Sequence, residues 1–335
     1  MGAMMDDTAG RLTVDVIIPT YKPGERFGKL LVMLRKQTYP IRQVIIINTE
    51  EKYWNKELEK ECPNLVLRHI KKEEFDHGNT RHTAVQLSHA DVFLCMTDDA
   101  LPCDTHLIEE IVKGFGRRGP KGEAAAMVYA RQLPKEDCGC IERYTRRFNY
   151  PGKSRVKTKA DISQLGIKTY FASNVCCAYS REIYDRQGGF IRHAIFNEDM
   201  IYAGHAVQDG YCIVYQARAR VEHSHNYGCI QQFKRNFDLA VSQADHPEVF
   251  SGLPSEKEGI RLVRQTGGYL IRSGRPWLLA ELAAKSGFKY LGYLAGKHYR
   301  RIPLWLVKCC TMNPTYWRKE KSRVCGEAHT GGSKR

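Results

Sequence analysis

The sequence predicts an α/β fold in which a Rossmann-like nucleotide-binding half precedes a basic helical region. Between Val14 and Met96, apolar runs that suit buried strands alternate with segments of helical spacing. Each run is followed by a polar loop, and in a parallel sheet such loops lie at one edge. Beyond Ser251 the composition shifts towards Lys, Arg and aromatic residues. A chain of 335 residues can hold one large catalytic domain with an appendage, or two domains.

The elements of the first half follow from the positions of the apolar residues. Apolar runs that are typical of buried strands lie at residues 14–19, 43–48 and 92–96, and residues 65–69 are predicted as a further strand between the last two. Leu30, Leu31 and Leu34 have helical spacing within residues 27–37, and a later helix is predicted to start near Asn79. These segments make a βαβ unit whose ligand site is expected where the strands end.

Composition and charge exclude several classes of protein. The hydrophobic content of 42% is ordinary for a globular chain, and 52 Lys and Arg against 37 Asp and Glu give a formal net charge of +15. No apolar run approaches the ~18 to 20 residues that a transmembrane helix needs. The segment from Met1 to Gly10 contains Asp6 and Asp7 instead of the basic and apolar regions of a secretory signal. We therefore expect a cytoplasmic protein.

The twelve cysteines are expected to be reduced thiols, because the chain is long and shows no export signal. Structural zinc is the alternative, and its candidate ligands are the pairs Cys138 and Cys140, Cys176 and Cys177, and Cys309 and Cys310. No CxxC motif is repeated at ligand spacing, which disfavours zinc. Nucleic acid is not expected as a partner, since no RNP, KH, zinc-finger or helix-turn-helix pattern accompanies the positive charge.

The phosphate-binding motifs of dehydrogenases and P-loop NTPases are absent, because neither GxGxxG nor GxxxxGK[ST] follows the first strand. Instead, Asp98 and Asp99 follow the fourth strand. Paired carboxylates at a strand end offer the hard oxygen ligands that Mg2+ and Mn2+ prefer, and such an ion can neutralise a diphosphate. A solvated turn is the alternative explanation of an isolated acid pair.

Three stretches in this order resemble the family 2 glycosyltransferases of the GT-A fold. They are VDVIIPTYKP, the strand end Asn48-Thr49-Glu50, and FDHGNTRHTAVQLSHADVFLCMTDDALP. Within the family, the chain is most similar to bacterial rhamnosyltransferases that use dTDP-L-rhamnose. Their stretch FDHGxTRN is matched by Phe75 to Arg81, with His82 in the place of asparagine. The resemblance covers about residues 13–240 and implies a GT-A Rossmann-like fold with a mixed, mostly parallel sheet.

The resemblance implies donor-binding residues in the first half. Glu50 is placed to meet the nucleotide base, while Asp76 and Arg81 match positions that contact the base edge and the diphosphate. A salt bridge between Asp76 and Arg81 is the alternative. Gly78 is expected to shape the same loop with a positive φ. In the family, the loop after the first strand wraps the base and ribose, and here it contains Pro19, Thr20 and Tyr21.

The resemblance also implies a site for Mg2+ or Mn2+. The family's DxD element is replaced here by the adjacent pair, of which Asp99 is assigned to the metal and Asp98 to the ribose or sugar, although the reverse stays open. Residues 212–215 and 219–222 are predicted as a short strand pair. A histidine that follows this pair is expected to complete the metal shell, since imidazole accompanies carboxylates on Mn2+. The resemblance favours His225, with His223 as the alternative.

The second half is expected to carry the chemistry. Residues 170–179 are predicted as a strand on the acceptor side, and the later Glu198-Asp199 pair resembles the family's element in which the aspartate is the general base. Asp199 would accept the proton of the acceptor hydroxyl in an inverting transfer. Glu198 and Arg235 are assigned to the acceptor or the diphosphate. A helix cap is the alternative for the acids, and a solvated helix face is the alternative for Arg235.

The segment that contains Arg235 is similar to the QxxRW element of processive synthases, but Asn236 stands in the place of the tryptophan. This departure argues against a processive synthase. The predicted organisation is a transferase domain, a C-terminal amphipathic helical region and a disordered tail. Their bounds are 11–250, with a donor half at about 11–103 and an acceptor half at about 104–250, then 251–325 and 326–335.

The C-terminal region is strongly basic, with fifteen Lys and Arg against four Glu between Glu256 and Arg323. Apolar and aromatic residues are interleaved with this charge. Such helices suit the headgroup layer of an anionic membrane, and packing on the catalytic domain is the alternative. A peripheral position on the inner face of the bacterial cell membrane is therefore expected.

The predicted function is that of an inverting, metal-dependent glycosyltransferase. By resemblance, it transfers L-rhamnose from dTDP-L-rhamnose to a lipid-linked glycan acceptor in the synthesis of a bacterial surface polysaccharide. A UDP-hexose or UDP-N-acetylhexosamine donor is the alternative. An inactive relative that binds a sugar nucleotide without turnover is a further one.

Overall fold

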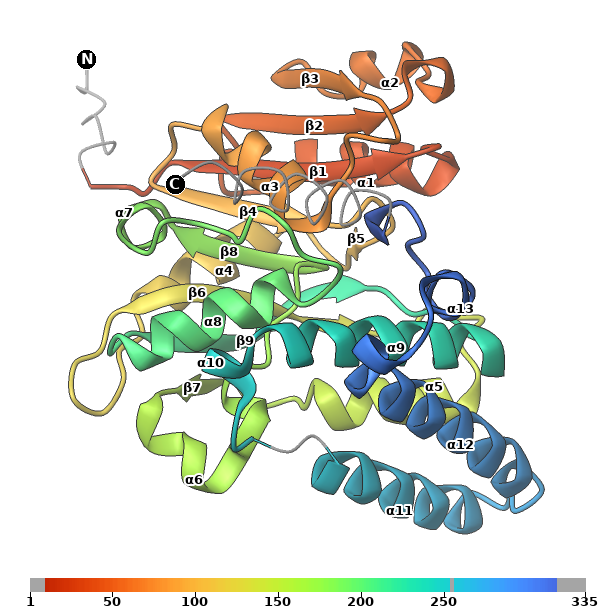
Figure 1. The fold of residues 1–335 in the computed structure, drawn as a ribbon. Helices are drawn as coiled ribbons and strands as arrows, with labels where there is room; N and C mark the ends of the chain where they lie inside the picture. Colours follow the sequence, from red (N-terminus) through yellow and green to blue (C-terminus); the bar gives the residue numbers. More distant parts are fainter. Residues whose placement is uncertain (1–9, 254–255, 318–335) are drawn as a thin grey trace, which may run out of the picture.

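A mixed nine-stranded sheet separates two layers of helices in the computed structural model, which describes residues 10–253 and 256–317 (Figure 1). The strands run in the order β3-β2-β1-β4-β8-β6-β9-β5, and β7 pairs with β9 beside this path. The strands are β1 (Val14–Tyr21), β2 (Gln43–Thr49), β3 (Leu65–Ile70), β4 (Val92–Met96), β5 (Leu101–Pro102), β6 (Ala125–Leu133), β7 (Arg155–Lys157), β8 (Cys176–Ser180) and β9 (Cys212–Glu222).

Helices connect these strands and follow them. In chain order they are α1 (Glu25–Arg35), α2 (Glu57–Lys60), α3 (His77–Gln86), α4 (Leu107–Phe115), α5 (Cys140–Asn149), α6 (Ile162–Leu165), α7 (Arg181–Arg186), α8 (Glu198–Gln208), α9 (Cys229–Asp245), α10 (Pro247–Phe250), α11 (Glu256–Arg272), α12 (Leu278–Lys297) and α13 (Leu304–Cys310).

The first four strands are parallel, as their apolar runs predict. Ile17 of β1 lies opposite Ile45 of β2 and Cys95 of β4, and β2 in turn pairs with β3. Parallel neighbours end at the same edge of a sheet, so the loops that follow β1, β2 and β4 lie close together. Of the predicted donor-binding residues, Glu50 and Asp98 follow β2 and β4. Pro19, Thr20 and Tyr21 lie at the end of β1 itself, and Asp76, Gly78 and Arg81 lie at the start of α3.

The rest of the sheet is mixed. β8 is antiparallel to β4 and β6, whereas β9 is parallel to β6 and antiparallel to β5 and β7. The three longest ladders, β6 with β9, β1 with β2 and β2 with β3, are all parallel. The expectation of a mixed, mostly parallel sheet is therefore confirmed.

Two predicted elements of this half were wrong. Of residues 170–179, only the end is a strand, because a 3-10 turn occupies Gly166–Thr169 and the chain is irregular up to β8. The predicted strand pair at 212–215 and 219–222 is the single strand β9. Its register against β6 jumps where Ala130 faces Gln216 but Arg131 faces Arg220, so an irregularity in the ladder accommodates residues 217–219 within one strand.

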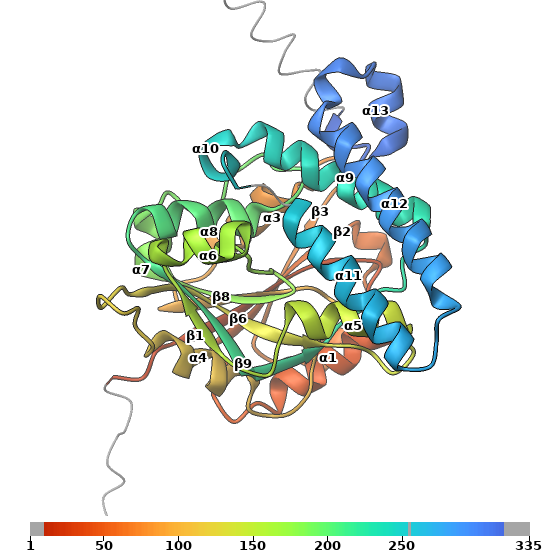
Figure 2. The same ribbon diagram turned by 90° about the horizontal axis from the view of Figure 1, so that it is seen from below.

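Alternate residues of the central strands face opposite helical layers. Leu30 of α1 and Ile108 of α4 share a buried cluster with Ile18 of β1. Val85 of α3 belongs to the other cluster, together with Ile17. Figure 2 shows α1 and α4 on one side of the sheet and α3 and α8 on the other. The continuous apolar runs of the sequence are thus explained by burial on both faces.

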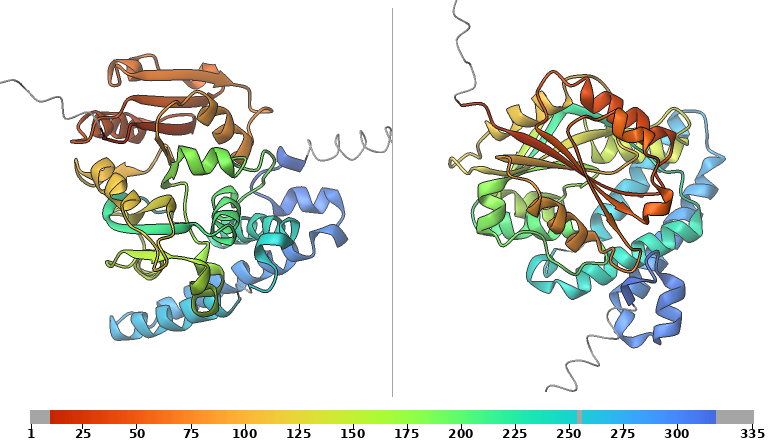
Figure 3. Two further views of the ribbon diagram at one scale, coloured as in Figure 1. Left: turned by 90° about the vertical axis from the view of Figure 1, so that its left-hand side faces the viewer. Right: turned by 90° about the horizontal axis from the view of Figure 1, so that it is seen from above.

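The C-terminal helices pack on the second half, at the end of the molecule opposite β1–β3 (Figure 3). α12 lies so close to α9 that a Cβ added at Gly292 would be 2.2 Å from the carbonyl oxygen of Phe233. Leu282 of α12 and Leu270 of α11 share a buried cluster with Ile141 of α5. The end of the predicted C-terminal helical region, residues 318–325, and the predicted tail at 326–335 lie outside the described residues. Among the described helices, none combines the length and the apolar character needed to span a bilayer.

Candidate active site

Polar side chains gather where the parallel strands end. Thr20, at the end of β1, donates a hydrogen bond from its hydroxyl to Oδ2 of Asp98, 2.8 Å away in the turn after β4. Burial raises the pKa of Asp98; the bond from Thr20 opposes this rise, and the charge of Asp99 adds to it. The loop after the first strand and the acid pair therefore lie side by side, as expected for a parallel sheet.

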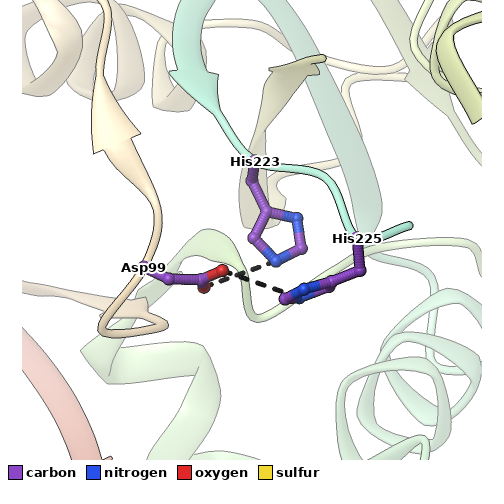
Figure 4. A group of neighbouring side chains, drawn as sticks. All are labelled: Asp99, His223 and His225. Carbon is purple, nitrogen blue, oxygen red and sulfur yellow. Dashed lines mark ion pairs between the residues drawn. The ribbon is translucent and has the colours of Figure 1, made fainter. Parts of the chain in front are cut away.

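Asp99 faces the two histidines that follow β9 (Figure 4). Nε2 of His223 lies 3.4 Å from Oδ1 of Asp99, and Nε2 of His225 lies 3.6 Å from Oδ2. The ligand atoms of the three residues all lie within 4.8 Å of one another. The structure thus brings both candidate histidines to Asp99. In residues 10–253 and 256–317, none of the cysteine pairs belongs to such a group.

A buried glutamine orients His223. Nδ1 of His223 lies 3.0 Å from Oε1 of Gln132 on β6, and Arg146 donates to the same oxygen at 2.6 Å, which fixes the orientation of the amide. An amide oxygen only accepts, so Nδ1 carries the proton and Nε2 keeps a free lone pair towards Asp99. Burial lowers the pKa of His223 to about 3 even though Asp99 opposes this, so the imidazole is neutral at pH 7.

Two basic residues outside the predicted site hold the same cluster. Arg26 of α1 donates from Nε to the carbonyl oxygen of Asp99 at 2.7 Å, and from Nη2 to the carboxylate of Glu222 at 2.8 Å. It therefore joins the end of β4 to the end of β9. Lys135, in the loop after β6, places Nζ 3.3 Å from Oδ2 of Asp99.

The electrostatic balance at Asp99 favours a carboxylate. Burial raises the pKa of Asp99, but His223, His225 and Lys135 outweigh it and lower the pKa below its ordinary value. One ionised oxygen donor and two imidazole nitrogens fit a divalent cation, and this mixture suits Mn2+ better than Mg2+. The residues present therefore fit the predicted metal.

The Glu-Asp element lies in the first turn of α8. Asp199 is half-buried, and its two carboxylate oxygens accept from the backbone N–H groups of Asn174 and Met200, each at 2.8 Å. Glu198 is buried, accepts from the side-chain amide of Asn174 at 3.0 Å, and forms an ion pair with Arg81 at 2.9 Å. The two neighbouring acids therefore have different partners.

These partners separate the pKa values of the two acids. Burial raises the pKa of Asp199 to about 7, and the charge of Glu198 adds to the rise. Burial also acts to raise the pKa of Glu198, but Arg81 and His77 outweigh it, so its pKa is lowered. At neutral pH Glu198 is ionised, whereas Asp199 changes its protonation state. A carboxylate with this pKa is suited to proton transfer.

Hydrogen bonds and the peptide bond between Ser173 and Asn174 link His223 of the Asp99 cluster to Asp199. Gln132, which orients the first histidine, donates from Nε2 to Oγ of Ser173 at 3.1 Å. The next residue is Asn174, whose backbone and side chain bind the two acids of α8. The metal-type cluster and the half-buried carboxylate thus belong to one site.

The stretch Phe75 to Arg81 forms the start of α3, which begins at His77 and thus before the predicted start near Asn79. Asp76 caps this helix, since its Oδ1 accepts from two backbone N–H groups of the first turn, each at 3.0 Å. Gly78 lacks the predicted positive φ. A Cβ there would instead lie 1.9 Å from the carbonyl oxygen of Ile191, so close packing requires the glycine.

The alternative of a salt bridge between Asp76 and Arg81 was wrong. Oδ2 of Asp76 lies 3.0 Å from Nδ1 of His193, and the guanidinium of Arg81 is paired with Glu198. Arg81 is only 7% exposed, so its charge is directed into the interior towards α8. The structure therefore does not bring Arg81 to the Asp99 cluster.

An aromatic and acidic rim lies beyond the ends of β1 and β2. Tyr21 is 42% exposed, and its ring centre lies 5.7 Å from that of Tyr53 in an edge-to-face arrangement. Glu50 follows β2 with a φ of 67°, and its Oε1 accepts from the backbone N–H of Lys72 at 2.8 Å. Pro19 lies within β1 itself. Exposed aromatic rings beside an acid are suited to a nucleobase.

Arg235 is exposed on α9, on the other side of the cluster. Its guanidinium carbon lies 4.7 Å from the ring centre of Phe196 and 5.9 Å from that of Tyr227. Tyr227 in turn stacks on His225 at 5.0 Å. Aromatic rings thus hold the guanidinium of Arg235 beside the Asp99–His223–His225 cluster.

Four residues that hold the site were missed in the sequence. They are Arg26, Gln132, Lys135 and Asn174. Each comes from a different element and lies outside the motifs, and a single sequence contains no signal that joins them.

A family model and two relatives of known name match the chain. Residues 15–188 match the model of Glycosyl transferase family 2. The chain is similar to the O-antigen chain rhamnosyltransferase RfbN of Salmonella typhimurium, with 36% identity over 310 residues, which are 91% of this chain and 96% of the relative. It is also similar to the O-antigen chain rhamnosyltransferase WbaN of Salmonella anatum, with 35% identity over 307 residues, 90% and 95% of the two chains.

Among solved structures, the mannosyltransferase PcManGT from Pyrobaculum calidifontis in complex with GDP-Man and Mn2+ has the same fold. It matches with a TM-score of 0.54 and 17% identity, over 92% of this chain and 85% of its own. The predicted α/β fold of the GT-A type is thus confirmed. By both the family model and the two relatives, the chain belongs to glycosyltransferase family 2.

Proposed function

We propose that this glycosyltransferase is an inverting, metal-dependent rhamnosyltransferase that transfers L-rhamnose from dTDP-L-rhamnose to a lipid-linked glycan of a bacterial surface polysaccharide. The observation that carries the mechanism is the pairing, in one hydrogen-bonded site, of the Asp99–His223–His225 cluster with the Asp199 carboxylate. The donor assignment is supported by the names of the two relatives and by the stretch Phe75 to Arg81.

Asp199 is proposed as the general base. The acceptor hydroxyl attacks the anomeric carbon of the donor, and its proton passes to a carboxylate oxygen of Asp199. As the new C–O bond forms, the bond from the anomeric carbon to the diphosphate breaks, and its electron pair leaves with the nucleoside diphosphate. The backbone N–H groups of Asn174 and Met200 orient the base, and Glu198 helps to keep its pKa near 7.

Asp99, His223 and His225 are proposed to hold Mg2+ or Mn2+. When bound, such an ion supplies positive charge for the leaving diphosphate. Arg235 supplies a second positive charge from α9, where Phe196 and Tyr227 hold its guanidinium. The burial of Arg81 favours a different role from the predicted diphosphate contact, namely holding Glu198 in its ionised form.

The donor nucleotide is proposed to lie along the edge formed by the ends of β1, β2 and β4. Tyr21 and Glu50 offer a ring and an acid for the base, and Thr20 holds Asp98 for the ribose or sugar. Asp76 and Gly78 shape this edge indirectly, by capping α3 and by packing it on Ile191.

The stereochemical outcome tests this mechanism. Purified protein is incubated with dTDP-L-rhamnose, Mn2+ and a lipid-linked glycan, and the anomeric configuration of the product is compared with that of the donor by NMR. Inversion is expected, because a single base acts on a single displacement. A product with the donor's configuration would remove Asp199 from its proposed role.

We also assign the C-terminal helices to an anionic membrane surface that carries the acceptor. Ten of the thirteen exposed large hydrophobic residues in the described chain belong to residues 256–317. Trp277 is 69% exposed and Trp305 is 68% exposed, and Leu291 on α12 is 56% exposed. Part of this region packs on the rest of the protein, as the buried Leu282 does. The side chains of Trp277, Leu291 and Trp305 are exposed instead. Exposed tryptophans among basic residues suit the headgroup layer.

A further inference from the structure

Lys135 occupies the carboxylate oxygen that a metal ion would use. Its ammonium nitrogen lies 3.3 Å from Oδ2 of Asp99, and His225 faces the same oxygen at 3.6 Å. The side chain of Lys135 is 20% exposed and that of Asp99 is 25% exposed, so the pair is sheltered but open on one side. The lysine therefore neutralises Asp99 in the arrangement that the structure shows.

The backbone of Lys135 is fixed beside the histidines, whereas its ammonium is joined to the site by a flexible stem. Its backbone N–H donates to Oγ of Ser224 at 3.0 Å, and its carbonyl oxygen accepts from Arg143 at 3.3 Å. Asn226 holds the same loop through its side-chain amide, which donates to the carbonyl oxygen of Asp137 at 3.0 Å. Four methylene groups separate this anchor from the charge, so the charge can move while the loop stays in place.

Two cations that both approach Oδ2 of Asp99 would repel each other. The repulsion is strong here, because the Lys135–Asp99 pair is sheltered from water, which screens charges at the exposed surface. A divalent ion on Asp99 therefore forces the ammonium away from that oxygen. A nucleoside diphosphate that arrives with the ion brings at least two negative charges to the same place. The anchored position of Lys135 leaves its ammonium within reach of that new negative charge.

We propose that Lys135 is an exchangeable counter-ion, which neutralises Asp99 in the free enzyme and moves to the nucleoside diphosphate when metal and donor bind. This inference rests on the proposed function. It assigns two effects to one residue. Without nucleotide, Lys135 opposes the binding of the metal to Asp99. With nucleotide, it stabilises the bound diphosphate and the negative charge that develops when the nucleoside diphosphate leaves.

The test measures Mn2+ binding to the full chain by electron paramagnetic resonance, with and without dTDP. Lys135→Met is expected to bind Mn2+ about tenfold more tightly than the wild type when dTDP is absent, because the competing charge is gone. With Mn2+ saturating, the same variant is expected to bind dTDP about tenfold more weakly. Lys153→Met, which changes an exposed lysine outside the site, should match the wild type in both measurements.

Lys135→Gln serves as a second variant of similar length in case Lys135→Met does not fold, and circular dichroism checks the fold of each. Unchanged Mn2+ affinity in both variants, or unchanged dTDP affinity, would overturn the exchange. Asp99→Ala separates this failure from that of the proposed function. If wild type binds Mn2+ and Asp99→Ala does not, only the role of Lys135 is lost. If wild type binds no Mn2+, the metal assignment and the exchange fail together.

Discussion

Glu198 and Asp199 are adjacent in sequence, yet their surroundings give them opposite properties. Glu198 is buried against Arg81, whose charge keeps it ionised. Among the described residues, Asp199 accepts hydrogen bonds from two backbone N–H groups. Burial raises its pKa to about 7, and the neighbouring charge of Glu198 adds to the rise. Two carboxylates with separated pKa values are a recurring arrangement in acid–base catalysis. This contrast is the physical basis for the proposal that Glu198 is a fixed charge and Asp199 the proton acceptor.

Asp199→Asn should abolish transfer and leave the fold and the donor affinity intact. The amide is similar in size but has no basic oxygen to accept the acceptor proton, and loss of a general base costs about 10²- to 10⁴-fold in rate. Turnover is measured with dTDP-L-rhamnose and acceptor, and donor affinity by calorimetry. A variant with wild-type turnover would show that the base is another residue.

The rate should depend on pH through the pKa of Asp199. The base is active only when deprotonated, so kcat should fall about tenfold for each pH unit below about 7 and reach a plateau above it. Glu198→Gln should shift this midpoint to lower pH, because it removes the negative charge that raises the pKa of Asp199. A midpoint that moves upwards in this variant would contradict the electrostatic assignment.

At the scale of elements, the sequence predicted the parallel half well because β1, β2 and β4 are buried and read as apolar runs. The second half offered weaker signals. In β9, Gln216 and Arg218 interrupt the apolar pattern near the register shift, so the sequence predicted two strands where the structure has one. The segment before β8 is apolar but irregular, since its backbone serves the site through Asn174. Apolar pattern cannot distinguish these cases from regular strands.

The packing of α12 on α9 provides a test at this scale. Gly292→Ala should lower the free energy of unfolding by about 1–3 kcal/mol, because its methyl group would meet the backbone of Phe233. Gly287→Ala lies on the same helix with no atom within 4 Å of the new Cβ, and it should raise stability by up to about 1 kcal/mol. Urea unfolding of both variants measures the difference. Equal stabilities would mean that α12 is not held against α9.

At the scale of the whole molecule, the site is assembled from distant parts of the chain. The family resemblance assigned roles to Asp99, to His225 with His223 as the alternative, and to Asp199, and the structure brings Asp99 to both histidines. Arg26 and Gln132 could not be found in this way, since their role depends on which strands become neighbours in the folded sheet. The order β4-β8-β6-β9 is what places β6 beside the histidines, and it is a property of the topology.

The exposed apolar side chains of the C-terminal helices are proposed to bind a membrane surface. A triple variant, Trp277→Ser, Leu291→Ser and Trp305→Ser, should lose most of its flotation with vesicles of anionic lipid, because it removes exposed apolar side chains. Leu12→Ser, which changes an exposed apolar residue outside the region, is the control. Undiminished flotation of the triple variant would place the membrane contact elsewhere.

The most direct test of the account is the release of nucleoside diphosphate from a panel of donors. Wild type and Asp99→Ala are compared on dTDP-L-rhamnose, UDP-glucose, UDP-galactose and UDP-N-acetylglucosamine, with acceptor and with Mg2+, Mn2+ or EDTA. We expect release from dTDP-L-rhamnose that requires the metal and is lost in Asp99→Ala. Release from a UDP-sugar alone would contradict the donor assignment, and release that is indifferent to EDTA and to the substitution would contradict the metal site.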